Sequence, residues 1–367
     1  MEATKCNLVS FVTIGCILVL LPRMAKAQQT YKPPAVFIFG DSLSDPGNNN
    51  YIRTLSRANN PPNGIDFPGG YPTGRYSNGR TTVDIIGQLL GLTEFIPPYL
   101  APNTTGAMIL NGVNYASGAG GILDSSGYIL YGRIAMNKQL DYFANTKAQI
   151  IAMLGEEVGM RLISSALYSS NLGSNDYLNN YYQPASPIGN LSSSQVAALV
   201  LTTYRGQLTR LYNLGARKIV VASLGPIGCI PFQLTFRFSR DGQCSEKVNA
   251  QAREFNAGLL GLVNELNANL PGAKIVYADA YKGVSEMIAN PSAFGFSVVD
   301  RGCCGAGGPY KGAVPCLPNF KICPNRFDYL FWDPYHPTDK ANVVLSNRFW
   351  DTPGYTYPMS VKQLIMS

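Results

Sequence analysis

The chain has a single histidine, His336, among its 367 residues. This scarcity excludes a zinc-protease motif of the HExxH type, which needs two histidines. The sequence also contains no GxSxG nucleophile elbow, no Walker A loop and no GxGxxG dinucleotide fingerprint. We therefore expect neither a metal ion nor another cofactor.

Charge is also sparse. Only 14% of the residues are charged, and the formal net charge is +7. The basic residues are scattered rather than clustered, whereas a nucleic-acid site needs a basic face. We find no charge run, no internal repeat and no linker-like stretch, and 46% of the residues are hydrophobic. These features indicate one globular domain that binds no nucleic acid.

Long apolar runs are absent except near the N-terminus. There, Lys5 precedes the nearly continuous apolar run 7–21, and Ala25-Lys26-Ala27 offers a small-residue cleavage site. The run is short for a membrane span, which takes about 20 residues. We predict a signal peptide at 1–27, a single mature domain at 28–367 and secretion to the extracellular space, with attachment to the cell wall left open. Cleavage removes three basic residues and one acidic residue, so the net charge falls from +7 to +5.

Cysteine usage agrees with export. Two of the eight cysteines lie in the first segment, and the remaining six permit 15 disulfide connectivities. A local pair at 229 and 244 is plausible, and the cluster 303–323 favours pairing within itself. A zinc site is less favoured because the cluster has no histidine and no paired CxxC spacing. Glycosylation sequons stand at Asn103 and Asn190. The disulfide candidates are Cys229, Cys244, Cys303, Cys304, Cys316 and Cys323.

Short apolar runs alternate with longer helical patterns. Strands are expected at 35–39, 111–116, 162–169, 218–222 and 274–278, although periodicity does not exclude a helix over 162–169. Helices are expected at 81–90, 193–215, 245–270 and 337–349, and 61–79 reads as a loop. The alternation indicates a parallel sheet covered on both faces. Active sites of such sheets lie beyond the carboxyl ends of the strands.

A candidate nucleophile and base stand out. Ser42 directly follows the first expected strand, where its hydroxyl would be exposed at the sheet rim. A helix cap is the competing interpretation of Ser42. Imidazole is the usual base for activating serine. His336 is the only one available, and Asp333 is close enough to orient it. Asp333 has a competing interpretation as the cap of the following helix.

Two further segments could stabilise an oxyanion. Gly118 lies in the glycine-rich stretch 117–121, where a backbone N–H can face a substrate without a side chain in the way. Asn175 lies in Gly-Ser-Asn-Asp at 173–176, where its amide can donate. Each is weak evidence alone, because such sequences are routine loop chemistry.

Taken together, these motifs resemble the GDSL or SGNH hydrolase family, in its plant-type esterase/lipase branch. The matching segments are FGDSLSDPGNNNY, YPTGRYSNGRTTVDIIGQLLGL, GVNYASGAGGIL, LGSNDY, RGCCG and FWDPYHPTDKAN. The resemblance implies a flavodoxin-like three-layer α/β/α sandwich with a central parallel sheet. It also implies a triad of Ser42, Asp333 and His336, with an oxyanion hole formed by Ser42, Gly118 and Asn175. The stretch reads SGAGG where the branch more often has SGGAG, so a neighbour of Gly118 remains an alternative donor.

The implied activity is cleavage of carboxylic esters through a covalent acyl-enzyme. Small-molecule, lipid or polyester acyl groups would be the substrates, and no obligate protein partner is implied. The same triad would serve an acyltransferase that builds extracellular polyester. A third possibility is a catalytically idle wall or defence protein that retains the fold for binding. The intact set of catalytic positions argues against the third possibility.

Overall fold

The structure is a computed structural model that describes residues 32–237 and 239–367. The predicted signal peptide lies outside the described residues, and its cleavage stays a prediction. In the described ranges, no helix is both long and apolar enough to cross a bilayer.

The central feature is a sheet in the order β2-β1-β3-β4-β5-β8. All neighbouring strands in it are parallel except β5 and β8. The order of the parallel strands is the flavodoxin-like one. The strands of this sheet are β1 (Val36–Gly40), β2 (Gly112–Asn114), β3 (Leu167–Asn171), β4 (Lys218–Ala222), β5 (Lys274–Ala278) and β8 (Thr356–Tyr357). A separate parallel pair consists of β6 (Val298–Gly302) and β7 (Tyr329–Phe331).

Helices connect the strands and cover the sheet. They are α1 (Thr82–Leu89), α2 (Met136–Leu154), α3 (Glu156–Ser165), α4 (Ser174–Asp176), α5 (Ser193–Asn213), α6 (Pro231–Phe236), α7 (Glu246–Asn269), α8 (Ala280–Ala289), α9 (Asp339–Asp351) and α10 (Val361–Met366). Short 3-10 turns are η1 (Asn48–Tyr51), η2 (Gly106–Asn111), η3 (Tyr128–Leu130), η5 (Ile227–Cys229), η6 (Pro291–Phe294) and η7 (Arg326–Asp328), and η4 (Tyr177–Tyr181) is a π-helical turn.

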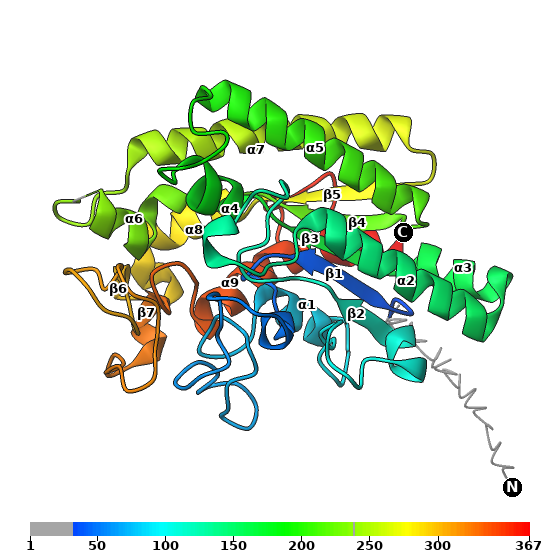
Figure 1. The fold of residues 1–367 in the computed structure, drawn as a ribbon, viewed down its shortest axis with the longest axis horizontal. Helices are drawn as coiled ribbons and strands as arrows, with labels where there is room; N and C mark the ends of the chain where they lie inside the picture. The colour runs from blue at the N-terminus through cyan, green and yellow to red at the C-terminus, as the bar shows by residue number, and fades with distance from the viewer. Residues whose placement is uncertain (1–31, 238) are drawn as a thin grey trace, which may run out of the picture. The chain divides into compact units, whose positions relative to one another are not determined.

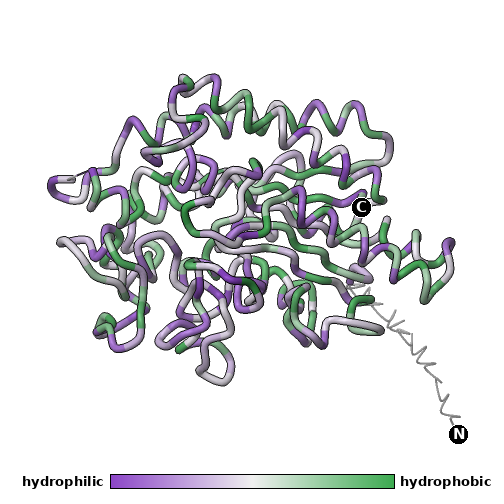
Figure 2. The backbone as a smooth tube through the Cα atoms, in the orientation of Figure 1, coloured by the Kyte–Doolittle hydropathy of each residue, from purple (hydrophilic) through white to green (hydrophobic). Residues whose placement is uncertain are grey.

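Two hydrophobic cores lie on opposite faces of the sheet. Helices α2, α3, α5 and α7 cover one face, and α1, α9 and α10 cover the other (Figure 1). Figure 2 shows the apolar strands as a hydrophobic centre, with more polar backbone in the outer loops. The fold is therefore the predicted three-layer α/β/α sandwich.

The strands start level with one another. Val36 pairs with Leu167, Leu167 with Lys218, and Lys218 with Lys274. Their carboxyl ends consequently reach the same edge of the sheet, and the loops after β1 and β3 emerge side by side. This alignment brings the turn after residue 40 close to the turn after residue 171.

Most expected elements agree with the structure to within two or three residues. The prediction of a strand over 162–169 is wrong in its first half, because Leu162 to Ser165 form the last turn of α3 and the strand begins at Leu167. Ile163 is fully buried from that turn, so an apolar run shared by a helix end and a strand shows neither period clearly. Helix α2 was not anticipated at all.

Candidate active site

Ser42 sits in a tight turn at the carboxyl end of β1. The Asp41 carbonyl accepts the N–H groups of Ser44 at 3.1 Å and Asp45 at 3.0 Å. The Asp41 carboxyl accepts the Leu43 N–H at 2.9 Å. No described helix begins at Ser42, so it does not act as a cap. Its Oγ instead lies 2.8 Å from Nε2 of His336.

His336 is oriented by Asp333 from the turn between β7 and α9. Its Nδ1 lies 2.8 Å from both Asp333 carboxyl oxygens. Oδ1 of Asp333 also accepts the backbone N–H groups of Tyr335 and His336, both at 2.8 Å. These contacts favour the tautomer in which Nδ1–H donates to Asp333 and Nε2 accepts from the Ser42 hydroxyl. The cap of α9 is Thr338, so Asp333 is free of that competing role.

The imidazole is held on several sides. The Tyr76 ring lies 5.1 Å from the His336 ring between centroids. The turn itself is closed by the Trp332 N–H, which donates to the His336 carbonyl at 2.8 Å. The fully buried Trp332 indole donates to Oδ1 of Asn63 at 2.8 Å. Such packing holds the imidazole in one orientation.

All six described cysteines are paired. Cys229 bonds to Cys244, as the local spacing suggested. Within the 303–323 cluster, one disulfide links 303 to 323 and another links 304 to 316. The backbone N–H groups of Cys303 and Cys304 donate to the carbonyls of Phe331 at 3.0 Å and Trp332 at 2.7 Å. The cross-linked loop therefore supports the strand that leads to Asp333.

Asn175 lies in α4, just beyond β3. Gly173 has a φ of 123°, a conformation that favours glycine, and it turns the chain there. Asn175 is buried, and two hydrogen bonds fix the orientation of its side-chain amide. Its Nδ2 donates to the Gly120 carbonyl at 2.9 Å, and its Oδ1 accepts from Asn179 at 2.6 Å. One N–H of the amide remains for the cavity beside Ser42, which Asn175 lines.

The glycine-rich bend gives a mixed result for Gly118. Its N–H donates to Oδ2 of Asp45 at 2.9 Å, so it already has an acceptor. A Cβ at this position would come within 2.1 Å of the Tyr76 hydroxyl, which explains the glycine on steric grounds. The next residue, Ala119, has a φ of 68° and lines the cavity with Ser42. In the part of the chain that the structure describes, the Ala119 N–H has no hydrogen-bond acceptor.

Sequence reasoning did not single out three buried polar residues that hold these turns. Asp45 accepts the N–H groups of Gly47 and Asn48, each at 2.7 Å, besides that of Gly118. Asp176 accepts the N–H groups at 122 and 123, at 2.9 and 2.8 Å. Gln139 of α2 brackets Gly40, accepting its N–H at 2.9 Å and donating to its carbonyl at 2.8 Å. In the sequence, Asp45 and Asp176 were marked only by lying inside motif segments, and Gln139 lies outside all of them.

Burial shifts several of these carboxyls. It raises the pKa of Asp41 to about 7, and the pKa values of Asp45 and Asp176 to about 6. Hydrogen bonds from backbone N–H groups oppose the shift in all three cases. Asp41 has the largest pKa shift and borders the cavity next to Ser42.

Comparison with known proteins decides the family. Residues 36–349 match the family model described as GDSL-like Lipase/Acylhydrolase. The chain belongs to the GDSL lipase/acylhydrolase family. A GDSL esterase/lipase of Arabidopsis thaliana is 49% identical over 340 residues, covering 91% of each chain. Another from the same plant is 46% identical, covering 86% of this chain and 83% of its own.

Solved structures are more distant. An acetyl-xylooligosaccharide esterase from Geobacillus aligns over 87% of this chain and 93% of its own, with 13% identity and a TM-score of 0.40. The family membership and the curated relatives make this protein a carboxylic ester hydrolase of the GDSL esterase/lipase class.

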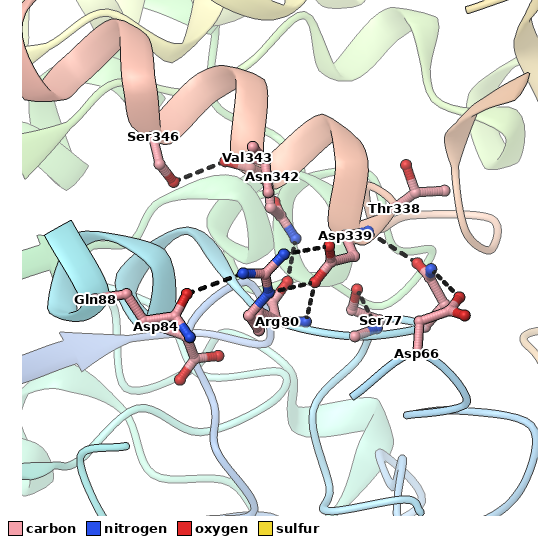
Figure 3. A network of polar contacts seen from close by, with 12 residues as sticks. Asp66, Ser77, Arg80, Asp84, Gln88, Thr338, Asp339, Asn342, Val343 and Ser346 are labelled. Atoms are coloured by element: carbon pink, nitrogen blue, oxygen red, sulfur yellow. Dashed lines mark hydrogen bonds and ion pairs between the residues drawn. The ribbon is translucent and has the colours of Figure 1, made fainter. Parts of the chain in front are cut away.

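In this GDSL hydrolase, a polar clamp joins the segment before α1 to the first turn of α9. Figure 3 shows the Arg80 guanidinium turned toward Asp339. Asp339 accepts from Arg80 through the backbone N–H at 2.6 Å, Nε at 2.9 Å and Nη2 at 2.8 Å. Asn342 donates to the Arg80 carbonyl at 2.9 Å, and the Asp339 N–H donates to Asn78 at 2.8 Å. Because Asp339 lies three residues after His336, the clamp fixes the helix that follows His336.

A cavity of about 570 Å³ opens at the triad, a size typical of ligand sites. Its mouth carries exposed apolar side chains from separate segments: Leu55 is 67% exposed, Ile129 39% and Leu317 42%. Leu317 follows Cys316 of the cross-linked loop, and the Leu55 N–H donates to the Leu130 carbonyl at 3.1 Å. The mouth of the GDSL site is therefore apolar on two sides.

Among the described residues, no group of three or more His, Cys, Asp or Glu side chains is placed to hold a metal ion. The sequon residues Asn103 and Asn190 are both exposed. Glycosylation at these sites stays a prediction.

Proposed function

We propose that this protein is a secreted esterase that cleaves acyl esters through a covalent acyl-enzyme on Ser42. The observation that carries the proposal is the pair of 2.8 Å contacts that His336 makes, one with Ser42 through Nε2 and one with Asp333 through Nδ1. His336 takes the hydroxyl proton as Oγ attacks the ester carbonyl. It then returns that proton to the leaving alcohol, and water repeats the sequence to release the acid.

The oxyanion is assigned to a small set of donors. Asn175 Nδ2 and the Ser42 backbone N–H are two of them, and the third comes from the Gly118–Ala119 bend. Because the Gly118 N–H is donated to Asp45, the Ala119 N–H is the better placed of the two. Donors that are already oriented lower the barrier without reorganisation at the moment of reaction.

Export is supported by the three disulfides in the described residues, because such cross-links persist in oxidising compartments. An apolar acyl substrate is supported by the side chains at the mouth of the cavity.

The test is turnover of p-nitrophenyl butyrate by the mature chain and by Ser42→Ala. We expect the variant to lose several orders of magnitude in kcat while remaining folded. Ser44→Ala is the matched control, because the Ser44 hydroxyl is buried two residues away and has no partner among the described residues. It should keep near-normal turnover. A folded Ser42→Ala with normal turnover would exclude the mechanism.

A phosphonate inhibitor adds a second measurement. It should label one peptide, containing Ser42, and the label should be absent from Ser42→Ala. Adding an alcohol acceptor to the same assay separates the two fates of the acyl-enzyme. Release of free acid as the main product supports hydrolysis, whereas predominant transfer to the alcohol would indicate an acyltransferase. Absence of both turnover and labelling would indicate an idle binding protein.

A further inference from the structure

The two faces of the sheet carry side chains of different size. The face toward α5 and α7 presents Phe37, Tyr168 and Tyr277, which are buried in the larger core. The face toward α1 and α9 presents two small residues, Ser169 in the middle of β3 and Ala222 at the carboxyl end of β4. Side chains alternate between faces along a strand, so this difference is set residue by residue.

The small-residue face is not fully packed. Tyr168 and Val221, which point to the opposite face, are completely buried. Their neighbours Ser169 and Ala222 are only half-buried, although β3 and β4 are interior strands covered by helices. Protein interiors are normally packed without such space, because unfilled apolar volume destabilises the fold.

This space is continuous with the active site. The cavity that borders Ser42 and His336 also borders Val36, Leu167 and Phe349 at the far end of the strands. Val36 lies four residues before Gly40 on β1. At about 3.3 Å per residue, the inner part extends for roughly 13 Å beneath the sheet.

The inner walls are mostly apolar, with Thr82, Ser169 and Asn342 among the polar exceptions. They consist of side chains from the sheet and from α1, α8, α9 and α10, and none of those in the described residues is charged. The charged groups that border the cavity, Asp41, Arg57 and Asp333, lie at the turn after β1, in the following loop and in the turn before α9. A cavity lined mainly by apolar and uncharged side chains favours hydrocarbon over charged groups.

We propose that this inner chamber, defined by Val36, Ser169, Val220, Ala222, Val284 and Phe349, holds the acyl chain of the substrate while the ester carbonyl lies at Ser42. The inference rests on the proposed function, because it takes Ser42 as the point of attachment. With C–C bonds of about 1.5 Å in a zigzag chain, about 13 Å accommodates roughly ten carbons. The chamber thus selects medium-chain acyl esters of about eight to twelve carbons.

The first experiment compares kcat/KM for p-nitrophenyl esters from acetate to palmitate. For the wild type we expect kcat/KM to rise to a maximum near decanoate. Ala222 is the last residue of β4, level with Gly40 at the active-site end of the chamber. Ala222→Phe therefore places a ring across the entrance of the chamber and should lower the decanoate-to-acetate ratio of kcat/KM by about 30-fold or more. The matched control is Ala198→Phe, at an exposed position on α5, and it should leave this ratio unchanged.

Folding of each variant is checked by circular dichroism. If Ala222→Phe fails to fold, Val284→Phe narrows the chamber from α8 and is measured in the same way. An unchanged chain-length ratio in a folded chamber variant overturns the proposal. A wild-type maximum at acetate does the same.

A binding measurement separates this inference from the proposed function. Titration calorimetry of Ser42→Ala with methyl nonyl ketone, a neutral and uncleavable analogue of a decanoyl ester, should detect binding. Adding Ala222→Phe should weaken that binding about 30-fold or more. Equal binding by both forms overturns the chamber, even if Ser42 proves to be the nucleophile. A Ser42→Ala protein that still hydrolyses esters overturns the mechanism, and the ketone titration still decides whether the chamber binds acyl chains.

Discussion

Asp339 lies outside the active site, but removing its charge should lower both the stability of the protein and kcat. Asp339→Asn keeps the shape of the side chain but removes its charge. The amide oxygen can still accept weaker hydrogen bonds from Arg80, whereas the amide nitrogen is a donor, so at least one of the three contacts is lost. The Arg80 and Asp339 side chains are 28% and 16% exposed, so solvent screens the ion pair only in part. Hydrogen bonds to charged groups contribute about 1.5–3 kcal/mol when buried, and exposed ion pairs contribute about 0–1 kcal/mol.

For a partly buried clamp we therefore expect a loss of about 2 kcal/mol in the free energy of unfolding. The Asp339 charge in the first turn of α9 adds a helix-dipole contribution of about 0.5 kcal/mol. For a domain of this size the sum lowers Tm by about 4 °C. Because the helix begins just after His336, kcat should also fall about tenfold, since small misplacements of a catalytic group are costly.

Differential scanning calorimetry and p-nitrophenyl butyrate kinetics measure both effects. The matched control is Glu157→Gln, in the i,i+4 pair with Arg161 whose side chains are 84% and 64% exposed. It should change neither Tm nor kcat. If Asp339→Asn behaves like this control, the clamp is a surface ion pair with no role in placing the base. A shift in KM at constant kcat would also contradict a role in positioning His336.

Three further outcomes are expected. Asn175→Ala should lower kcat by about 10²- to 10³-fold with little change in KM, as measured with a short-chain ester, because one oxyanion donor is lost; a rise in KM alone would make it a ground-state contact. The free energy of unfolding should fall as the pH rises from about 4 to about 7. The reason is that the buried Asp41 carboxyl keeps its proton up to a pKa of about 7, whereas the same carboxyl in the unfolded chain loses its proton near 4. Chemical denaturation at pH 5 and pH 8 should show this loss, and Asp41→Asn should reduce it. Protein from a secretory host should carry glycans at Asn103 and Asn190, and treatment with a peptide-N-glycosidase should shift its mobility on a gel. Unchanged mobility would contradict glycosylation at both sites.

Much of the fold was predictable because its strands are short, apolar and bounded by turns. Lys218–Ala222 and Lys274–Ala278 agree with the predicted bounds residue for residue. Helix α2 was not predicted, because it begins after Ala135 without a side-chain cap and because polar residues interrupt its apolar positions. The boundary between α3 and β3 was obscured because buried apolar residues continue across it, from Ile163 of α3 to Leu167 and Tyr168 of β3.

The site was partly readable for a different reason. A sole histidine leaves one candidate for an imidazole base, and its spacing from Asp333 fits a tight turn. The acceptor of the Gly118 N–H was not readable, because it depends on Asp45 approaching from another loop. The inner chamber also depends on which face of the sheet each small residue occupies and on what lies opposite it. Both features depend on contacts between segments that are distant in the sequence, and local sequence patterns do not predict such contacts.

Ser42 and His336 touch although 294 positions separate them in the sequence. The proposed nucleophile is therefore synthesised early, and the proposed base is synthesised only after the four inner strands of the sheet. Contacts of such long range form late and slowly during folding, because their loops are costly to close. A nascent or truncated chain would possess the serine without its activator. Recovery of ester turnover after denaturation consequently reports completion of the entire domain, from its first strand to its last long helix.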